Sequence, residues 1–292
     1  MRLGTRGSAL ALAQAEAISS ALGGLDVVTI ETSGDRGEEG DKARFVKEIE
    51  EALLDEEIDL AVHSAKDLPT EIPDGLALVG VSEREDPADA YCGHARSFGE
   101  IPPGASIGTS SLRRASQLRA AREDLEVLEV RGNVDTRLAK LGETSLNGIV
   151  LAAAGLRRLG REDAIAFRFG EDEMTPAAGQ GTLALEAREG DPEAAAAAAT
   201  ITDEAALIEL TAERAAIGGL EADCNTPVGI RARLDGDRLV VDGFVGLPDG
   251  TRWVRDSLWG DAGQPGSLGL ELAEQLLNAG GGAILRQAER LD

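Results

Sequence analysis

Apolar residues recur at alternating strand and helix spacings from the start of the chain. Residues 3–5 predict a short strand, and the apolar positions of residues 10–22 follow the spacing of a helix that ends at Gly23 and Gly24. Further strands are expected at 27–30, 60–63 and 76–81, with a second helix at 45–53. Strands that alternate with helices predict a mostly parallel, doubly wound sheet.

The same alternation starts again after residues 83–87, which predicts a second lobe of similar architecture. Its strands are expected at 106–108, 125–130 and 148–151, with helices that begin near residues 112 and 134. The alanines of residues 194–199 fit either a linker or a short helix.

A third unit begins near residue 202. A helix is expected at 204–217, strands at 228–234, 238–246 and 251–259, and a last helix after Gly266. This order predicts a small α+β domain with a three-stranded antiparallel sheet.

Composition narrows the classes of function. The 292 residues contain no run near the roughly 18 apolar residues of a membrane-spanning helix, so no membrane partner is expected. The first residues lack the apolar core of a secretory signal, which favours a cytoplasmic location. A formal charge of −24 argues against nucleic acid as a partner. This charge, with only four lysines, also predicts adaptation to a salt-rich cytosol, because salt screens like-charge repulsion.

The cysteines have to be interpreted singly. Two cysteines and two histidines, without a CxxC pair, argue against a disulfide framework and a structural zinc site. Cys92 is interpreted as structural, whereas Cys224 lies in a polar turn between a predicted helix and a strand and is a candidate nucleophile. The sequence holds no Walker, GxGxxG or GxSxG motif, which argues against kinases, dehydrogenases and hydrolases.

Arginine follows several predicted strands, at the carboxyl edge where open α/β sheets bind ligands. TRGS at 5–8 and GTSSLRR at 108–114 resemble helix starts with hydroxyl caps, which offer N–H groups to anions. RGNVDTR at 131–137 and AGLRR at 154–158 follow two more strands. Any single arginine fits a solvated residue or a partner of the many acids. Their recurrence after successive strands instead predicts a ligand with several carboxylates.

Lys66 and Asp67 follow the strand at 60–63, at the same kind of edge. Asp67 could simply cap the chain or pair with Lys66. Its functional interpretation is an acceptor for N–H groups that stabilises positive charge on a ligand.

Seven segments, in this order, resemble the hydroxymethylbilane synthase (porphobilinogen deaminase) family across essentially the whole chain. They are TRGSALAL at 5–12, VHSAKDLP at 62–69, EREDP at 83–87, GTSSLRR at 108–114, RGNVDTRL at 131–138, PAAGQG at 176–181 and the turn that holds Cys224. The resemblance implies two α/β lobes with mixed sheets, like those of type II periplasmic binding proteins, an active cleft between them, and a small α+β C-terminal domain that carries the cysteine. The implied domains are residues 1–83 with 182–200, residues 86–178, and residues 203–292, and a monomer is expected.

The resemblance also implies an activity and residue roles. Cys224 would carry a dipyrromethane cofactor, made from two porphobilinogens, through a thioether. Four further porphobilinogens would be added with loss of ammonia, and water would release hydroxymethylbilane. Asp67 would be the catalytic carboxylate, which stabilises the cation formed as ammonia leaves. The cofactor's carboxylates would be held by Lys66, Thr109, Ser111, Arg113 and Arg114, and those of the substrate by Arg6, Ser8, Arg131, Arg137, Arg158 and Gln180. No metal ion is expected.

One segment departs from the family, and two alternatives stay open. Residues 36–42 are acidic where the family usually has a Gly- and Lys-rich lid, so only Lys42 and Phe45 are kept as lid contacts. A non-catalytic cytosolic anion-binding protein of the periplasmic-binding-protein fold would share the arginines without needing Cys224 or Asp67. A thiol enzyme would need a histidine near Cys224, and His63 and His94 belong to other predicted domains.

Overall fold

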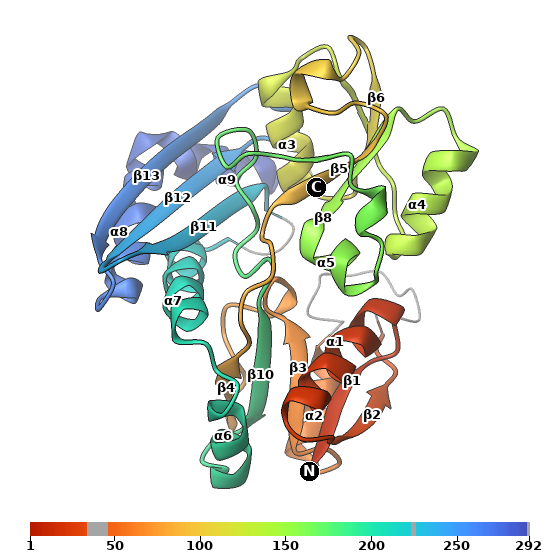
Figure 1. The fold of residues 1–292 in the computed structure, drawn as a ribbon. Coiled ribbons are helices and arrows are strands. Elements are labelled where there is room, and N and C mark those ends of the chain that lie inside the picture. Colours follow the sequence, from red (N-terminus) through yellow and green to blue (C-terminus); the bar gives the residue numbers. More distant parts are fainter. Residues whose placement is uncertain (34–45, 223–225, 291–292) are drawn as a thin grey trace. The chain divides into compact units, whose positions relative to one another are not determined.

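The computed structural model describes residues 1–33, 46–222 and 226–290 (Figure 1). The chain divides into two compact units. Unit 1 comprises Met1–Glu85 and Gly181–Ile208, and unit 2 comprises Asp86–Gln180 and Glu209–Asp292. The C-terminal segment therefore groups with the second lobe, and the three-domain boundaries stay a prediction.

Unit 1 is a five-stranded sheet with the order β2-β1-β3-β10-β4. β2, β1 and β3 are parallel, as the alternation of strands and helices predicts, but β10 is antiparallel to both of its neighbours and makes the sheet mixed. The elements are β1 (Arg2–Arg6), α1 (Ala9–Ala21), β2 (Asp26–Ile30), α2 (Lys47–Leu54), β3 (Leu60–Ser64), the 3₁₀ turn η2 (Ala65–Asp67), β4 (Leu76–Val81), β10 (Leu183–Arg188) and α6 (Pro192–Ala199).

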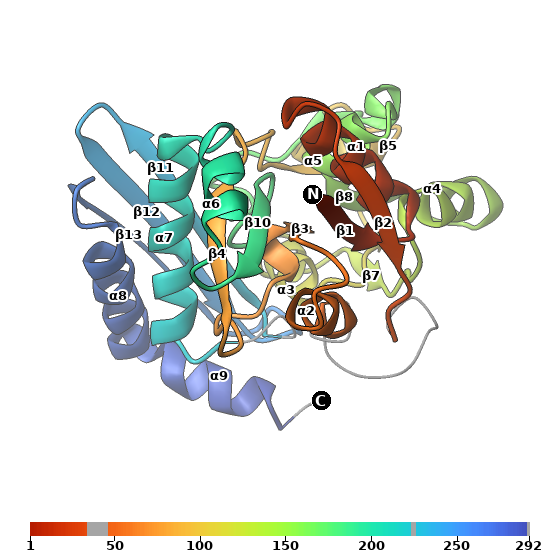
Figure 2. The ribbon, with the colours of Figure 1, turned by 90° about the horizontal axis from the view of Figure 1, so that it is seen from below.

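Two cores cover the two faces of this sheet, because successive strand residues point to opposite sides. Leu60 and Val62 of β3 pack in one cluster with Ile18 of α1. Ala61, between them, packs in the other cluster with Leu53 of α2. Figure 2 shows the two helices on opposite sides of β1. The run of alanines is the helix α6, since Asp191 caps it through the N–H groups of Glu193 and Ala194.

The α/β part of unit 2 repeats this design in the order β7-β6-β8-β5-β9. β6 is parallel to β7 and β8, and β5 is antiparallel to β8. One core packs under α3 and the other under α4 and α5. The elements are β5 (Asp89–Gly93), η3 (Phe98–Glu100), β6 (Ser106–Gly108), α3 (Leu112–Ala121), β7 (Glu126–Leu128), α4 (Val134–Glu143), β8 (Gly148–Ala152), α5 (Ala153–Arg158), η4 (Glu162–Ala164) and β9 (Phe167–Arg168).

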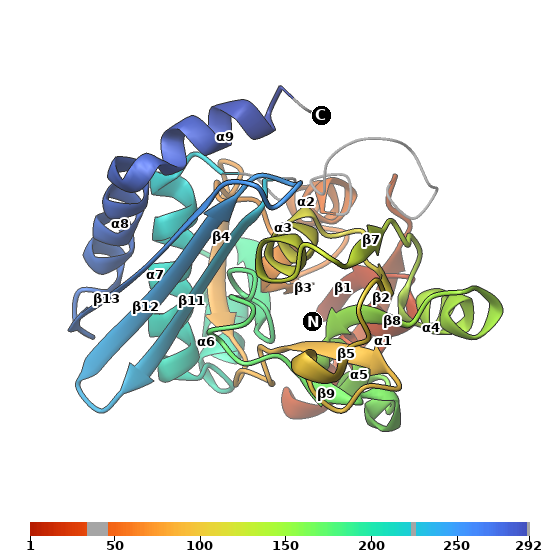
Figure 3. The same ribbon diagram turned by 90° about the horizontal axis from the view of Figure 1, so that it is seen from above.

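The C-terminal part of unit 2 is the predicted three-stranded antiparallel sheet, in the order β11-β12-β13. α8 buries Leu268, Leu272 and Leu276 and lies against β12 and β13 (Figure 3). Within the described residues, no helix has the length and hydropathy that crossing a membrane requires. The elements are α7 (Glu204–Gly219), which begins in unit 1, β11 (Val228–Asp235), β12 (Arg238–Gly246), β13 (Trp253–Asp261), α8 (Pro265–Leu276), the π-helical turn η5 (Leu277–Gly281) and α9 (Gly282–Ala288).

Candidate functional site

In unit 1, the predicted site residues gather at the carboxyl edge of the sheet. β1 and β3 are parallel neighbours, so the chain leaves both strands at the same edge. Arg6 ends β1, and β3 runs directly into η2, which holds Lys66 and Asp67. Ser8 caps α1 by accepting a hydrogen bond from the backbone N–H of Ala11 at 3.2 Å, as the hydroxyl pattern predicts.

In unit 2, the helices α3, α4 and α5 follow the parallel strands β6, β7 and β8 and begin at the carboxyl edge of these strands. Ser111 caps α3 by accepting from the backbone N–H of Arg114 at 3.4 Å. Thr109, only 4% exposed, accepts from the backbone N–H of Ser111 at 3.1 Å and so shapes the turn before the helix. Asn133 caps α4, which follows β7. The edge of this sheet therefore offers helix N-termini, which favour anions.

Arg113 and Arg114 turn their guanidinium groups into the interior of unit 2, where both meet Asp89. Each arginine is 5% exposed, and Asp89 is fully buried. Arg113 donates to the two carboxylate oxygens of Asp89 at 2.6 and 3.2 Å, and Arg114 donates to Oδ1 through Nε at 2.8 Å. Gln180 donates to the same Oδ1 at 3.0 Å. One carboxylate thus fixes the positions of two guanidinium groups and an amide.

The charges in this cluster do not balance. Burial raises the pKa of Asp89, but the charges of Arg113 and Arg114 outweigh burial and hold the pKa well below its ordinary value, so this carboxylate is ionised. Arg137 of α4 lies close enough to Arg114 for that charge to matter. Burial, with the charge of Arg114, lowers the pKa of Arg137 to about 10. Among the described residues, Arg113 and Arg114 thus share the single negative charge of Asp89, and Arg137 adds a further cation near Arg114.

Arg137 differs from the other two because the described residues offer its side chain no ion pair or hydrogen bond. Its Nε is buried and has no hydrogen-bond partner there. A buried guanidinium nitrogen without an acceptor is costly, which indicates that an acceptor not present among the described residues belongs beside Nε of Arg137.

The remaining predicted residues of unit 2 take different positions. Arg131 is on the surface, with a side chain 77% exposed, and pairs with Glu129 at 2.6 Å. Arg158 ends α5 and is partly buried. Gln180, 1% exposed, also donates to the backbone carbonyl of Pro87 at 2.6 Å. The structure therefore joins Gln180 directly to the cluster around Asp89 and leaves Arg131 at the surface.

The cysteines are only partly accounted for by the described residues. Cys92 lies in β5 and is 1% exposed, and burial raises the pKa of its thiol to about 12, so it is an inert core residue, in agreement with its structural interpretation. Cys224, Lys42 and Phe45 lie outside the described residues. Among the described residues, no group of three or more His, Cys, Asp and Glu side chains could hold a metal ion.

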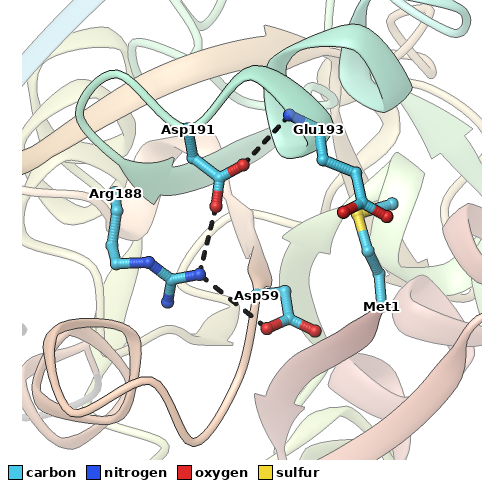
Figure 4. Close-up of a pocket in the computed structure, with 5 residues that line it drawn as sticks. All are labelled: Met1, Asp59, Arg188, Asp191 and Glu193. Atoms are coloured by element: carbon cyan, nitrogen blue, oxygen red, sulfur yellow. Dashed lines mark hydrogen bonds and ion pairs between the residues drawn. The ribbon is translucent and has the colours of Figure 1, made fainter.

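A polar pocket in unit 1 lies at the other end of the sheet. Met1, Asp59, Arg188, Asp191 and Glu193 line it (Figure 4). Met1 precedes β1 and Asp59 precedes β3, so the pocket belongs to the amino edge of these strands. Arg188 lies 3.1 Å from Asp191 and 3.8 Å from Asp59, so its charge is already compensated. This pocket therefore lacks the unbalanced charge of the Asp89 cluster.

Sequence reasoning missed Asp89, which organises the cluster. The signal was its position: an acidic residue opens the apolar run Ala90-Tyr91-Cys92, and a carboxylate in a buried strand needs a buried cation. Gln117 of α3 was also missed. It is 2% exposed and forms hydrogen bonds with the backbone of Thr175, a distant contact that has no local signal in the sequence.

Comparison with known proteins identifies the family. The model of "Porphobilinogen deaminase, dipyromethane cofactor binding domain" matches residues 1–196, and that of "Porphobilinogen deaminase, C-terminal domain" matches residues 207–278. The porphobilinogen deaminase of Syntrophus aciditrophicus is 45% identical over 302 residues, which cover 99% of each chain. Those of Roseiflexus castenholzii and Thermus thermophilus are each 47% identical and cover 98% of both chains.

Among solved structures, the periplasmic VFT2 domain of BvgS from Bordetella pertussis aligns with 69% of this chain and 86% of its own. The identity of 12% and the TM-score of 0.41 are too low to support a functional conclusion. The two family models and the full-length relatives are decisive instead. The chain belongs to the porphobilinogen deaminase family.

Proposed function

We propose that this chain is a hydroxymethylbilane synthase. It condenses four porphobilinogens head to tail, with loss of one ammonia each, on a dipyrromethane joined by a thioether to Cys224, and water then releases the linear tetrapyrrole. The family and its cofactor-binding domain support this activity. The cofactor supplies the primer, whose terminal pyrrole is the acceptor for the first porphobilinogen.

The observation that carries the proposal is the surplus of guanidinium groups, since Arg113 and Arg114 share the one carboxylate of Asp89 and Arg137 lies near Arg114. Each pyrrole of the substrate and of the cofactor bears an acetate and a propionate, so a dipyrromethane brings four carboxylates. Guanidinium groups fixed by a carboxylate are preorganised to bind such acids, and Nε of Arg137 has no acceptor among the described residues. The donors present at this edge therefore fit the cofactor.

We assign the roles as follows. Asp67 would accept hydrogen bonds from pyrrole N–H groups and stabilise the cation that forms on porphobilinogen as ammonia leaves. Carboxylates of the cofactor would bind to Lys66, Thr109, Ser111, Arg113 and Arg114. Carboxylates of the substrate would bind to Arg6, Ser8, Arg131, Arg137, Arg158 and Gln180, with Lys42 and Phe45 as lid contacts. Arg113 and Arg114, already held by Asp89, would act mainly through their surplus charge.

The proposal extends to the surroundings of the enzyme. We infer a monomer in a salt-rich cytoplasm. The chain has 53 acidic and 29 basic residues, and the mutual repulsion of the excess negative charges is weakest when salt screens it. An anion-binding protein without catalysis is the less favoured function, since the chain matches its enzyme relatives along nearly their whole length.

The intact mass of the purified chain tests the proposal. After expression with an adequate supply of porphobilinogen, the mass should exceed that of the sequence by two porphobilinogens less two ammonia molecules. Cys224→Ser should remove this increment, and Cys92→Ala should keep it, because the Cys92 thiol is buried. An unmodified parent chain, or an increment retained in Cys224→Ser, would refute the thioether.

A further inference from the structure

The helix α3 has two separate sets of contacts inside unit 2. Its first turn meets Asp89 through Arg113 and Arg114. Its next residues face the C-terminal sheet. A Cβ added at Gly246 of β12 would lie 2.3 Å from Oγ of Ser116, so the helix and this strand touch without room for a side chain. Arg119 donates to the carbonyl of Pro248 at 2.7 Å.

Gln117 lies between these two sets of contacts and uses both ends of its amide. Its Oε1 accepts from the backbone N–H of Thr175 at 2.8 Å and from Arg255 of β13 at 3.1 Å. Its Nε2 donates to the carbonyl of Thr175 at 3.0 Å. A single buried side chain therefore joins three segments: α3, the chain before Gln180, and the C-terminal sheet.

The contacts of Gln117 continue into the cationic cluster. The carbonyl of Thr175 also accepts from Arg113 at 2.7 Å, so Gln117 and Arg113 share one acceptor. In the other direction, β13 pairs with β12, β12 pairs with β11, and β11 begins at Val228, four residues after Cys224 in the sequence. Gln117 thus connects the carboxylate-binding end of α3 with the sheet that follows the tether.

We infer that Gln117 is a positioning residue for the proposed reaction. It holds the first turn of α3 in a fixed position relative to the domain that carries Cys224. The cofactor would be bound by its acids at one end and by its thioether at the other, so a shift between α3 and the sheet would misplace its terminal ring. The inference rests on the proposed function. The carboxylates of the substrate are assigned largely to other residues. Removing the hydrogen bonds of Gln117 should therefore lower kcat and leave KM nearly unchanged.

The test compares Gln117→Met, which removes every hydrogen bond at similar volume, with Gln117→Glu, which keeps the two acceptor contacts. Thermal stability, the fraction of molecules with the two-pyrrole mass increment, and kcat and KM per modified molecule are measured. Gln117→Met should lower kcat by about ten- to a hundredfold, as a misplacement near 1 Å does, and leave KM within about twofold. The kcat of Gln117→Glu should be much closer to that of the parent, because its carboxylate can still accept from Thr175 and Arg255.

A matched control separates positioning from stability. Leu272→Ala removes a fully buried side chain of α8, which packs at Gly243 on the face of β12 opposite to the one where Gly246 meets α3. It should lower the melting temperature with little change in kcat per modified molecule. If Gln117→Met does not fold, Arg255→Met removes the hydrogen bond between β13 and Oε1 of Gln117 and should also lower kcat.

Three outcomes would overturn the inference. A parental kcat in Gln117→Met, or in Arg255→Met if Gln117→Met does not fold, would show that the hydrogen bonds of Gln117 do not position the cofactor. An equal loss of kcat in Leu272→Ala would show that the effect is only instability. A parent chain without the mass increment would overturn the proposed function, and this inference with it.

Discussion

Glu50 is a buried acid whose protonation should control the stability of unit 1. It lies in α2 with 9% of its surface exposed, and its Oε1 has no hydrogen-bond partner among the described residues. The same face of the sheet holds His63 of β3 and Glu186 of β10, which are 6% and 0% exposed. Nε2 of His63 lies 3.1 Å from Oε2 of Glu186. Two carboxylates and one imidazole are therefore buried on this face of the sheet, close enough for the charges of Glu186 and His63 to act on Glu50.

Burial raises the pKa of Glu50 from 4.5 to about 7, and the charges of Glu186 and Glu51 add to this shift while that of His63 opposes it. In the unfolded chain the pKa is near its ordinary value. Below pH 4.5 both states hold the proton, and the contribution of Glu50 to the unfolding free energy is at its maximum. Between pH 4.5 and 7 only the folded state keeps it, so the contribution falls. The full loss above pH 7 is about 3 kcal/mol.

The substitution Glu50→Gln removes this titration while keeping a neutral side chain of the same shape. At pH 8 the variant should unfold with a free energy higher than that of the parent by about 2–3 kcal/mol, and at pH 5 the difference should fall below about 1 kcal/mol. Amide hydrogen exchange of the β3 and β10 peptides measures this in unit 1 itself, whereas both tryptophans lie in unit 2.

Glu51→Gln is the matched control, one residue away on the same helix. Glu51 is exposed and pairs with Lys47 at 3.7 Å on the surface, so its removal should change the free energy by less than about 1 kcal/mol at either pH. Equal stability of Glu50→Gln and the parent at pH 8 would refute the reasoning, as would a Glu51→Gln variant with the same pH dependence as Glu50→Gln.

Two further predictions concern the site and the charge of the whole chain. Asp67→Ala should leave the melting temperature nearly unchanged and slow ammonia release from porphobilinogen by about 10²–10³-fold; a turnover within a few-fold of the parent would contradict the role of Asp67. The melting temperature should rise by several degrees between 0.01 M and 1 M salt, as the screening length falls from about 30 Å to about 3 Å. A melting temperature that stays constant or falls would contradict salt adaptation.

Much of the fold follows from local sequence pattern, because alternation is a local property. The strand expected at 238–246 is found with the same bounds, and the strand expected at 228–234 is longer by one residue. β10 was not predicted, because its partner β3 lies more than a hundred residues earlier in the chain. The reversed direction of β10, which makes the sheet mixed, depends on that distant pairing and has no local signal.

The candidate site likewise combines features that follow from local sequence with features that depend on distant residues. The caps Ser8 and Ser111 follow from hydroxyl residues at helix starts, which are local features. The direction of Arg113 does not, because it is decided by Asp89, a residue that β5 brings from 24 positions away. The recurrence of arginine after successive strands predicts an anion opposite these side chains, and for Arg113 and Arg114 one such anion is the carboxylate of Asp89 in the chain itself.

The Asp89 cluster also explains how so acidic a protein could bind a polyacid. A net charge of −24 would repel a dipyrromethane if all charges acted at equal strength. They do not, because ions screen exposed charges beyond about 8 Å at physiological salt, while buried charges are screened much less. Arg113 and Arg114 are 5% exposed, and Nε of Arg137 is buried without a hydrogen-bond partner among the described residues. Among the described residues, guanidinium groups therefore outnumber carboxylates in this cluster, and more salt would weaken the repulsion by the surface before it weakened the attraction by the cluster.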